Sequence, residues 1–207
     1  MEEINDPKYI FQELCSRYTK SPKLINRLWE EIETAYSEPK RYYHNMNHLQ
    51  FMLREMTLIE DILEHPDSFK FSIFYHDIVY NAKRKDNEKK SAELAQERLA
   101  EIEFPQIEKV KKQIEATAQH ASSGDNDINF LLDIDLGILG QESSVYWEYT
   151  KNVRKEYSMY PYFLYKKGRK SVILHFLKME QVYSTAYFHA KYESQARLNL
   201  QNEMERM

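Results

Sequence analysis

Apolar residues between positions 49 and 63 recur at intervals of three and four residues, and this spacing constrains the fold more than any other feature of the chain. The stripe consists of Leu49, Met52, Leu53, Met56, Ile59, Ile62 and Leu63. That period gives an α-helix one apolar face. Only 4 Gly and 6 Pro occur in 207 residues, too few for the many turns of an all-β protein. The sequence therefore predicts an all-α fold.

Helical spacing recurs before and after this stripe. Further helices are expected around Ile10–Tyr18 and Leu24–Ile32, from Ser68 to Tyr80, from Asp86 onward, from Pro105 to about His120, and over 128–139, 142–158, 159–177 and 180–206. The helix of the main stripe should begin near the capping residues Asn45 or Asn47 and stop before Pro66. Gly168 is a candidate break. Because no repeat or linker divides the chain, residues 1–207 are expected to form one compact domain.

Charge and cysteine content exclude several classes of protein. The net charge is −4, from 29 Lys and Arg against 33 Asp and Glu, which argues against a general nucleic-acid binder. A small anionic substrate is still compatible with this charge. Cys15 is the only cysteine, so an internal disulfide and a cysteine-ligated zinc site are excluded. The chain shows no apolar leader and no span of membrane length, so we expect a cytoplasmic protein with no membrane partner.

His76 and Asp77 stand side by side in the apolar run from Phe71 to Tyr80. A buried charge is costly unless it is paired or binds a metal, so this doublet favours a cation site. His44 and His48 are four residues apart and would share one helix face. If the helix begins only at Asn45, His44 lies at its mouth instead.

Three more candidates follow further along the chain. His120 ends a predicted helix, and Asp133 and Asp135 interrupt the apolar segment 131–139. Imidazole and carboxylate ligands together suit one divalent ion, such as Mn, Ni, Co, Zn, Fe or Mg. An ion held by three or four protein groups keeps positions open for water, which it acidifies into a nucleophile.

The ordered set of His48, His76-Asp77 and Asp135 resembles the H…HD…D signature of the HD-domain superfamily of metal-dependent phosphohydrolases. Within that superfamily the chain resembles a subgroup of small bacterial predicted phosphohydrolases. The residues that carry this resemblance are Tyr43-His-Asn-Met-Asn-His48, Phe74-Tyr-His-Asp-Ile-Val-Tyr80, Asp86-Asn-Glu-Lys-Lys-Ser-Ala92, Leu132-Asp-Ile-Asp-Leu-Gly-Ile-Leu-Gly140, Val153-Arg-Lys-Glu-Tyr157 and Glu193-Ser-Gln-Ala-Arg197. They extend over roughly residues 40–200, so the resemblance covers most of the chain.

The resemblance implies metal ligation by His48, His76, Asp77 and Asp135. Family members with Asp-x-Asp at the last position generally use the second carboxylate as the ligand. Asp133 would then either support the metal ligands without touching the ion or serve as a charged residue at the N-terminal part of its helix. The segment from Tyr43 to His48 also resembles the start of the cyclic-nucleotide phosphodiesterase site, a distant relative. That likeness implies His44 as a general acid, a suitable task for an imidazolium near neutral pH.

Other residues have auxiliary roles in this hypothesis. Glu88 could orient the attacking water or accept its proton, and His120 could hold a second, weaker metal together with Asp77. Residues 78–119 contain no His, which disfavours a two-iron oxygenase. The candidate phosphate ligands are Lys83, Arg84, Arg154 and Arg197. Arg suits bidentate phosphate contact, although Arg154 and Arg197 could instead pair with Glu156 or Glu193.

We therefore expect an HD-type helical domain that is an enzyme with one divalent metal ion. The expected reaction is hydrolysis of a phosphate ester or anhydride in a small molecule, with a nucleotide as the favoured substrate. The alternative is a non-catalytic module that uses a metal to stabilise its fold and binds a nucleotide or a partner. Formation of a homodimer is left open.

Overall fold

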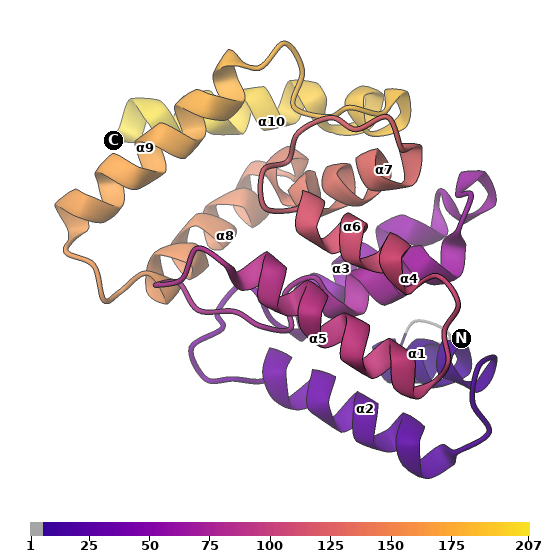
Figure 1. The fold of residues 1–207 in the computed structure, drawn as a ribbon. Helices are drawn as coiled ribbons and strands as arrows, with labels where there is room; N and C mark the ends of the chain where they lie inside the picture. The colour runs from indigo at the N-terminus through magenta and orange to yellow at the C-terminus, as the bar shows by residue number, and fades with distance from the viewer. Residues whose placement is uncertain (1–5) are drawn as a thin grey trace. The chain divides into compact units, whose positions relative to one another are not determined.

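The computed structural model describes residues 6–207 and confirms the predicted all-α class (Figure 1). Over this range the regular elements are α-helices and short 3₁₀-helices, and no strand occurs. The chain consists of two compact units, Met1–Ala121 and Ser122–Met207. A single domain over residues 1–207 stays a prediction.

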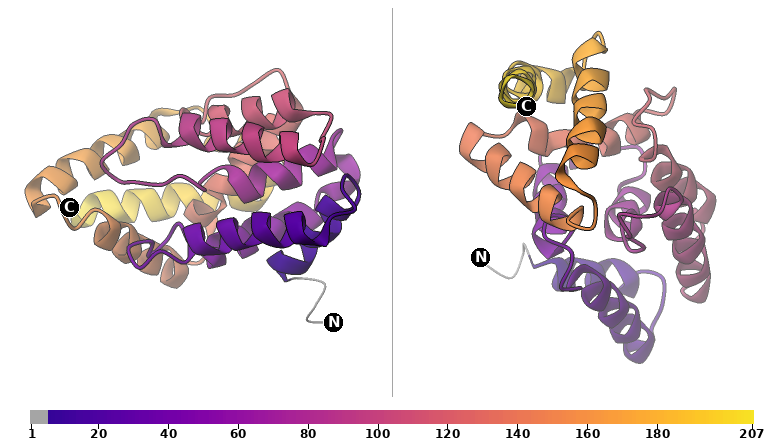
Figure 2. Two further views of the ribbon diagram at one scale, coloured as in Figure 1. Left: turned by 60° about the horizontal axis from the view of Figure 1, so that its bottom comes forward. Right: turned by 90° about the vertical axis from the view of Figure 1, so that its left-hand side faces the viewer.

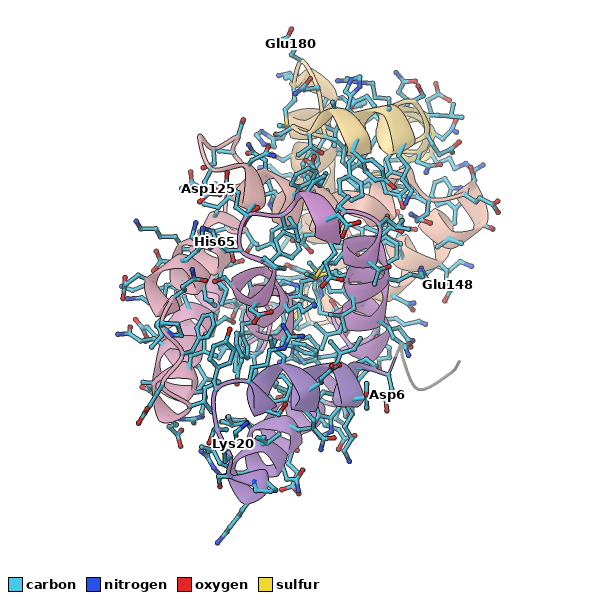
Figure 3. All side chains as sticks on the ribbon, turned by 90° about the vertical axis from the view of Figure 1, so that its right-hand side faces the viewer. Asp6, Lys20, His65, Asp125, Glu148 and Glu180 are labelled. Atoms are coloured by element: carbon cyan, nitrogen blue, oxygen red, sulfur yellow. The ribbon has the colours of Figure 1, made fainter. Side chains whose placement is uncertain are left out.

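Within its described residues, the first unit contains six α-helices and one 3₁₀-helix. They are α1 (Pro7–Ser16), α2 (Pro22–Tyr36), α3 (Met46–Thr57), η2 (Glu60–Ile62), α4 (Pro66–Tyr75), α5 (Asn87–Glu101) and α6 (Ile107–Ala116). Proline occupies the first position of α1, α2 and α4, where its missing N–H has no helical partner in any case. The Asp6 and Ser21 side chains cap α1 and α2; Figure 3 labels Asp6, and also His65 at the start of α4.

The core of the first unit is built around α4. Phe69, Phe71, Ile73, Phe74 and Tyr75 are all fully buried in it. Apart from Asp67 and Lys70, the residues of α4 are mostly buried, as expected of a helix that lies inside its unit, and α4 contacts α3, α5 and α6. Phe11 of α1 packs edge-on against Phe74 with ring centroids 5.1 Å apart. The C-terminal end of α4, where the His-Asp doublet lies, is therefore anchored by the core.

Two helices of the first unit are shorter than their apolar patterns predicted. The main stripe was expected to stay helical up to Pro66, but α3 ends at Thr57 and η2 follows. In this second part Ile59 is buried while Ile62 is 56 % exposed, so the stripe is not one continuous face. The helix expected to reach Tyr80 ends at Tyr75, because side chains replace its main-chain hydrogen bonds, as described below.

The second unit contains α7 (Asn126–Asp135), η3 (Leu136–Gly140), α8 (Ser143–Glu156), α9 (Tyr162–Lys178) and α10 (Ala186–Arg206). Figure 2 shows α9 beside α10, and the two helices are in contact. The expected break at Gly168 is wrong, since α9 continues through it. Gly140 is the last residue of η3. It also allows η3 to approach α10, because a Cβ there would meet the Tyr192 side chain.

Buried polar groups connect the helices of the second unit. The Arg169 guanidinium in α9 donates from Nε and a terminal nitrogen to the Glu203 carboxylate in α10, each at 2.9 Å. The Tyr146 hydroxyl in α8 donates to the same carboxylate. Burial is the main cause of the raised pKa of the Tyr146 hydroxyl, so this phenol stays protonated and can donate.

No helix within residues 6–207 combines the length and the apolar character needed to cross a bilayer.

Candidate metal centre

The structure brings three of the predicted ligands together in the first unit. His48 lies in the first turn of α3, whose start is fixed by the Asn45 side chain accepting from the main-chain N–H of Asn47. His76 is the C-cap residue of α4, and Asp77 follows it directly. One ligand atom from each of the three lies within 4.8 Å of the others. Because His48 and His76 are buried and Asp77 is half-buried, the group sits at the edge of the core.

The distances within this group fit a shared divalent ion. The Nε2 atoms of His48 and His76 are 3.2 Å apart, and His76 Nε2 lies 3.2 Å from an Asp77 carboxylate oxygen. Ligand atoms about 2.1 Å from one ion lie roughly 3.0 Å apart at octahedral angles and roughly 3.4 Å apart at tetrahedral angles. Both of these separations fall between the two values, and the third pair of ligand atoms lies within 4.8 Å, so the three residues could hold one metal ion.

The hydrogen bond on the other side of the His76 ring supports the same conclusion. Nδ1 of His76 lies 2.8 Å from the main-chain oxygen of Ile73. A carbonyl oxygen can only accept, so Nδ1 carries the proton and the neutral ring has its lone pair on Nε2. Metal-bound histidines are commonly oriented in this way. The last turn of α4 thus directs the ligand atom of His76 toward His48.

Side chains from distant parts of the first unit hold the backbone of the doublet. The Arg41 guanidinium donates to the main-chain oxygens of Asp77 and Ile78, at 2.6 and 2.9 Å. The Asp77 N–H donates to the Tyr36 hydroxyl at 3.2 Å. These bonds explain why α4 does not continue to Tyr80 and why the Asp77 side chain lies close to the imidazoles of His48 and His76.

The beginning of α5 holds the segment after the doublet. Ser91 Oγ accepts from the Val79 N–H at 3.1 Å and donates to the Val79 oxygen at 3.3 Å. The Asn87 amide makes the same pair of contacts with the N–H and oxygen of Asn81, both at 3.1 Å. Asn87 and Ser91 are one turn apart, so one face of α5 fixes the chain that leaves the site.

His44 lies beside the group but before the helix. Because α3 begins at Met46, the alternative in which His44 stands at the helix mouth is correct. Its Nε2 lies 4.0 Å from an Asp77 carboxylate oxygen, and its ring stacks on Tyr80 with centroids 4.3 Å apart. His44 is half-buried, with 22 % of its side chain exposed. The site therefore has a partly exposed imidazole next to a carboxylate that could bind a metal ion.

Other candidates from the first unit have different surroundings. Glu88 is half-buried in the first turn of α5, and its role near the attacking water stays a prediction. His120 has a left-handed backbone with φ of 48° beyond the end of α6 and does not belong to the three-residue group. Lys83 is exposed. Arg84 forms a bidentate pair with Asp86, which explains why the predicted cap Asp86 makes no side-chain cap bond to α5.

The two predicted carboxylates in α7 belong to the second unit and differ in their environment. Asp133 is buried and accepts three hydrogen bonds: from the Ser184 N–H, the Thr185 N–H and the Thr185 hydroxyl. Burial raises the pKa of its carboxyl, and the bonds from Thr185 and Ser184 oppose that rise. These contacts anchor the start of α10, which accounts for Asp133 without a metal. Asp135 is half-buried at the end of α7, and its assignment as fourth ligand stays a prediction.

The predicted arginines of the second unit bind main-chain carbonyls. Arg154 donates to the oxygens of Tyr157 and Tyr160 just beyond α8. Arg197 pairs with Glu193 and donates to the oxygens of Leu177, Met179 and Glu180 at the end of α9. The expected pairing of Arg197 with Glu193 is confirmed. These contacts explain both arginines as helix-end residues and give no support to phosphate binding.

Sequence reasoning missed the residues that frame the site. Arg41, Tyr36, Asn87 and Ser91 act through main-chain groups, which leave no spacing pattern in a sequence. The available signal was indirect: Arg41 opens the segment that contains His44 and His48, and Asn87 and Ser91 lie in the segment 86–92.

Comparisons with family models, with curated proteins and with solved structures found no match for this chain.

Proposed function

We propose that this protein is a metal-dependent phosphohydrolase of the HD type that acts on a small phosphorylated molecule, with a nucleotide as the favoured substrate. The observation that carries the proposal is the convergence of His48, His76 and Asp77 from α3 and from the end of α4. Their order in the chain is that of the signature described above, which adds Asp135 as a fourth ligand. The cytoplasm is the proposed location, consistent with a chain that has a single cysteine.

The three residues would hold the ion through two imidazole nitrogens and one carboxylate oxygen. A divalent ion bound there lowers the pKa of water and polarises a phosphoryl oxygen. Three protein ligands leave coordination positions for water and substrate. The rigid core beneath α4 keeps the two Nε2 atoms in place, so little reorganisation is needed when the site is loaded.

His44 is the proposed proton donor to the leaving oxygen. It lies beside Asp77, with Nε2 4.0 Å from a carboxylate oxygen, and its ring stacks on Tyr80. A general acid must reach the oxygen that it protonates, and the His44 side chain is 22 % exposed, which allows contact with a bound substrate. An imidazolium there would also attract a phosphate group, and the exposed Lys83 adds positive charge to the segment that follows the doublet.

The first test compares metal content and turnover. We expect elemental analysis of the purified protein to find a divalent metal in the wild type, and phosphate esters or anhydrides to be hydrolysed with added Mn, Ni, Co or Mg. His76→Ala and Asp77→Asn should lose both metal and turnover, because each removes one of three converging ligands. His65→Ala is the matched control, because His65 bonds to Gln106 and is not part of the group. It should retain both properties.

Two outcomes would contradict the proposal. Turnover by Asp77→Asn in the presence of a chelator would show that hydrolysis does not use this ion. A metal-loaded wild type that hydrolyses nothing on a broad panel, yet melts at a higher temperature with one nucleotide, would support the non-catalytic binding module instead.

A further inference from the structure

We propose that Arg41 is a positioning residue, which sets the orientation of the Asp77 carboxylate and of the His44 ring through main-chain and ring contacts. The inference rests on the proposed function, because it assigns Arg41 a role in metal binding at that same site. Arg41 itself is not a ligand. Its guanidinium is directed to the main-chain oxygens of Asp77 and Ile78 and not to the Asp77 carboxylate oxygens.

The hydrogen bonds of Arg41 are unusual for a buried arginine. Its side chain is only 2 % exposed, and its carboxylate neighbour Glu38 lies 3.6 Å from Nε. Two other nitrogens bind the consecutive carbonyls of Asp77 and Ile78. These two carbonyls follow the helix end, and a planar fork of donors matches two neighbouring acceptors better than a lysine does. Arg41 thus fixes the two peptide planes on either side of the Ile78 Cα, those of the Asp77–Ile78 and Ile78–Val79 peptides.

Aromatic rings extend this effect to His44. The centre of the Arg41 guanidinium lies 5.1 Å from the ring centroid of Tyr36 and 5.6 Å from that of Tyr80. The Tyr80 ring in turn stacks on His44 at an interplanar angle of 28°. The Tyr36 hydroxyl also accepts the hydrogen bond from the Asp77 N–H. One arginine therefore contacts the peptide of a metal ligand and the ring on which the proposed acid rests.

If Arg41 acted on the site only through its charge, its replacement by a neutral residue would strengthen metal binding, whereas loss of a positioning residue would weaken it. A buried positive charge close to a cation site disfavours the cation, so loss of that charge alone should strengthen metal binding. Loss of orientation should weaken it, because residues that orient ligands typically contribute about 10- to 100-fold to metal affinity. The two explanations therefore differ in the sign of the change when Arg41 is made neutral.

The experiment uses the full chain and Mn²⁺ alone as the probe, with binding followed by loss of the free-ion electron paramagnetic resonance signal. Arg41→Lys keeps the charge but cannot hold both carbonyls in a fork, and Arg41→Met removes the charge. We expect both variants to bind Mn²⁺ about 10- to 100-fold more weakly than the wild type. Amide hydrogen exchange over Asp77–Tyr80 should also become faster in both variants without metal.

Arg98→Lys is the matched control. Arg98 forms a bidentate pair with Glu31 in the same unit and contacts neither the doublet nor His44 through that pair. Its variant should keep wild-type Mn²⁺ affinity and wild-type exchange over Asp77–Tyr80. Any loss of global stability common to Arg41→Lys and Arg98→Lys is thereby separated from an effect on the site.

Stronger Mn²⁺ binding by Arg41→Met, or unchanged affinity in folded Arg41→Lys, would overturn the inference. If Arg41→Met does not fold, two other variants decide the question: Arg41→Lys, and Arg41→Ala with added ethylguanidinium. Failure of the added cation to restore slow amide exchange over Asp77–Tyr80 in Arg41→Ala would also contradict the inference. If the wild type binds neither Mn²⁺ nor any other of the divalent ions named above, the proposed function fails. The exchange measurement still decides whether Arg41 holds the doublet.

Discussion

Asp133 and Asp135 illustrate how two identical side chains two residues apart can lie in different environments. The sequence left both as candidates for the metal site, and only the resemblance favoured the second. The structure adds what no sequence pattern contains: the Asp133 carboxylate accepts from Ser184 and Thr185, about fifty positions later in the chain. Such long-range contacts between a side chain and main-chain groups are set by packing, not by local spacing.

Asp133→Asn should therefore destabilise the protein without affecting metal binding. The amide keeps one acceptor oxygen but presents an NH₂ group to an N–H donor, and loss of a hydrogen bond to a charged group costs about 1.5–3 kcal/mol. Urea unfolding should show this loss, while Mn²⁺ affinity should equal that of the wild type. Asp135→Asn should show weaker Mn²⁺ binding, as the resemblance implies. Reversal of these two results would transfer the ligand role to Asp133.

At the level of elements, the sequence predicted the helices better than their ends. Periodic apolar residues located α1, α2 and α3, and a capping asparagine located the start of α3, because these signals are local. The ends of α3 and α4 were predicted too late. An apolar run does not show where a distant side chain such as Arg41 will bind main-chain oxygens that would otherwise accept helical hydrogen bonds. The same bonds shape the candidate site, so the pattern fails at Tyr75, directly before the candidate metal ligands His76 and Asp77.

Gly140 and Gly168, two glycines in helical segments of the second unit, should respond oppositely to alanine. A Cβ on Gly140 would clash with the Cβ of Tyr192 and lie 2.8 Å from its Cγ, so η3 and α10 would have to separate. Overpacking of this kind costs about 1–3 kcal/mol. Gly168 lies inside α9 with no atom within 4 Å of its added Cβ. Gly168→Ala should stabilise the protein by about 0.5–1 kcal/mol, because glycine is a poor helix former.

Equilibrium unfolding of the two variants measures this difference. A Gly140→Ala protein as stable as the wild type would mean that α10 can shift away from η3 at no cost. A destabilised Gly168→Ala protein would mean that the exposed side of α9 is covered by something that the added methyl group displaces.

At the level of the whole molecule, the proposed ion should make the first unit harder to open. Cys15 in α1 is fully buried, and burial raises the pKa of its thiol to about 12. At pH 8 the native thiolate fraction is then about one in ten thousand, so a thiol reagent should react almost entirely through opened molecules. Since α1 contacts α3, which carries His48, labelling of Cys15 reports on opening of the part that holds the ion.

Labelling in moderate urea should become slower when Mn²⁺ is added. An ion that binds only the native state stabilises it in proportion to the logarithm of its concentration, by about 2.7 kcal/mol at 100 times its Kd. When reclosing is faster than labelling, this corresponds to a rate about 100-fold lower. In Asp77→Asn the ion should have no effect on the rate. If Mn²⁺ binds the wild type but leaves its Cys15 labelling rate unchanged, α1 opens independently of the metal site, and the ion stabilises only the contact between α3 and the end of α4.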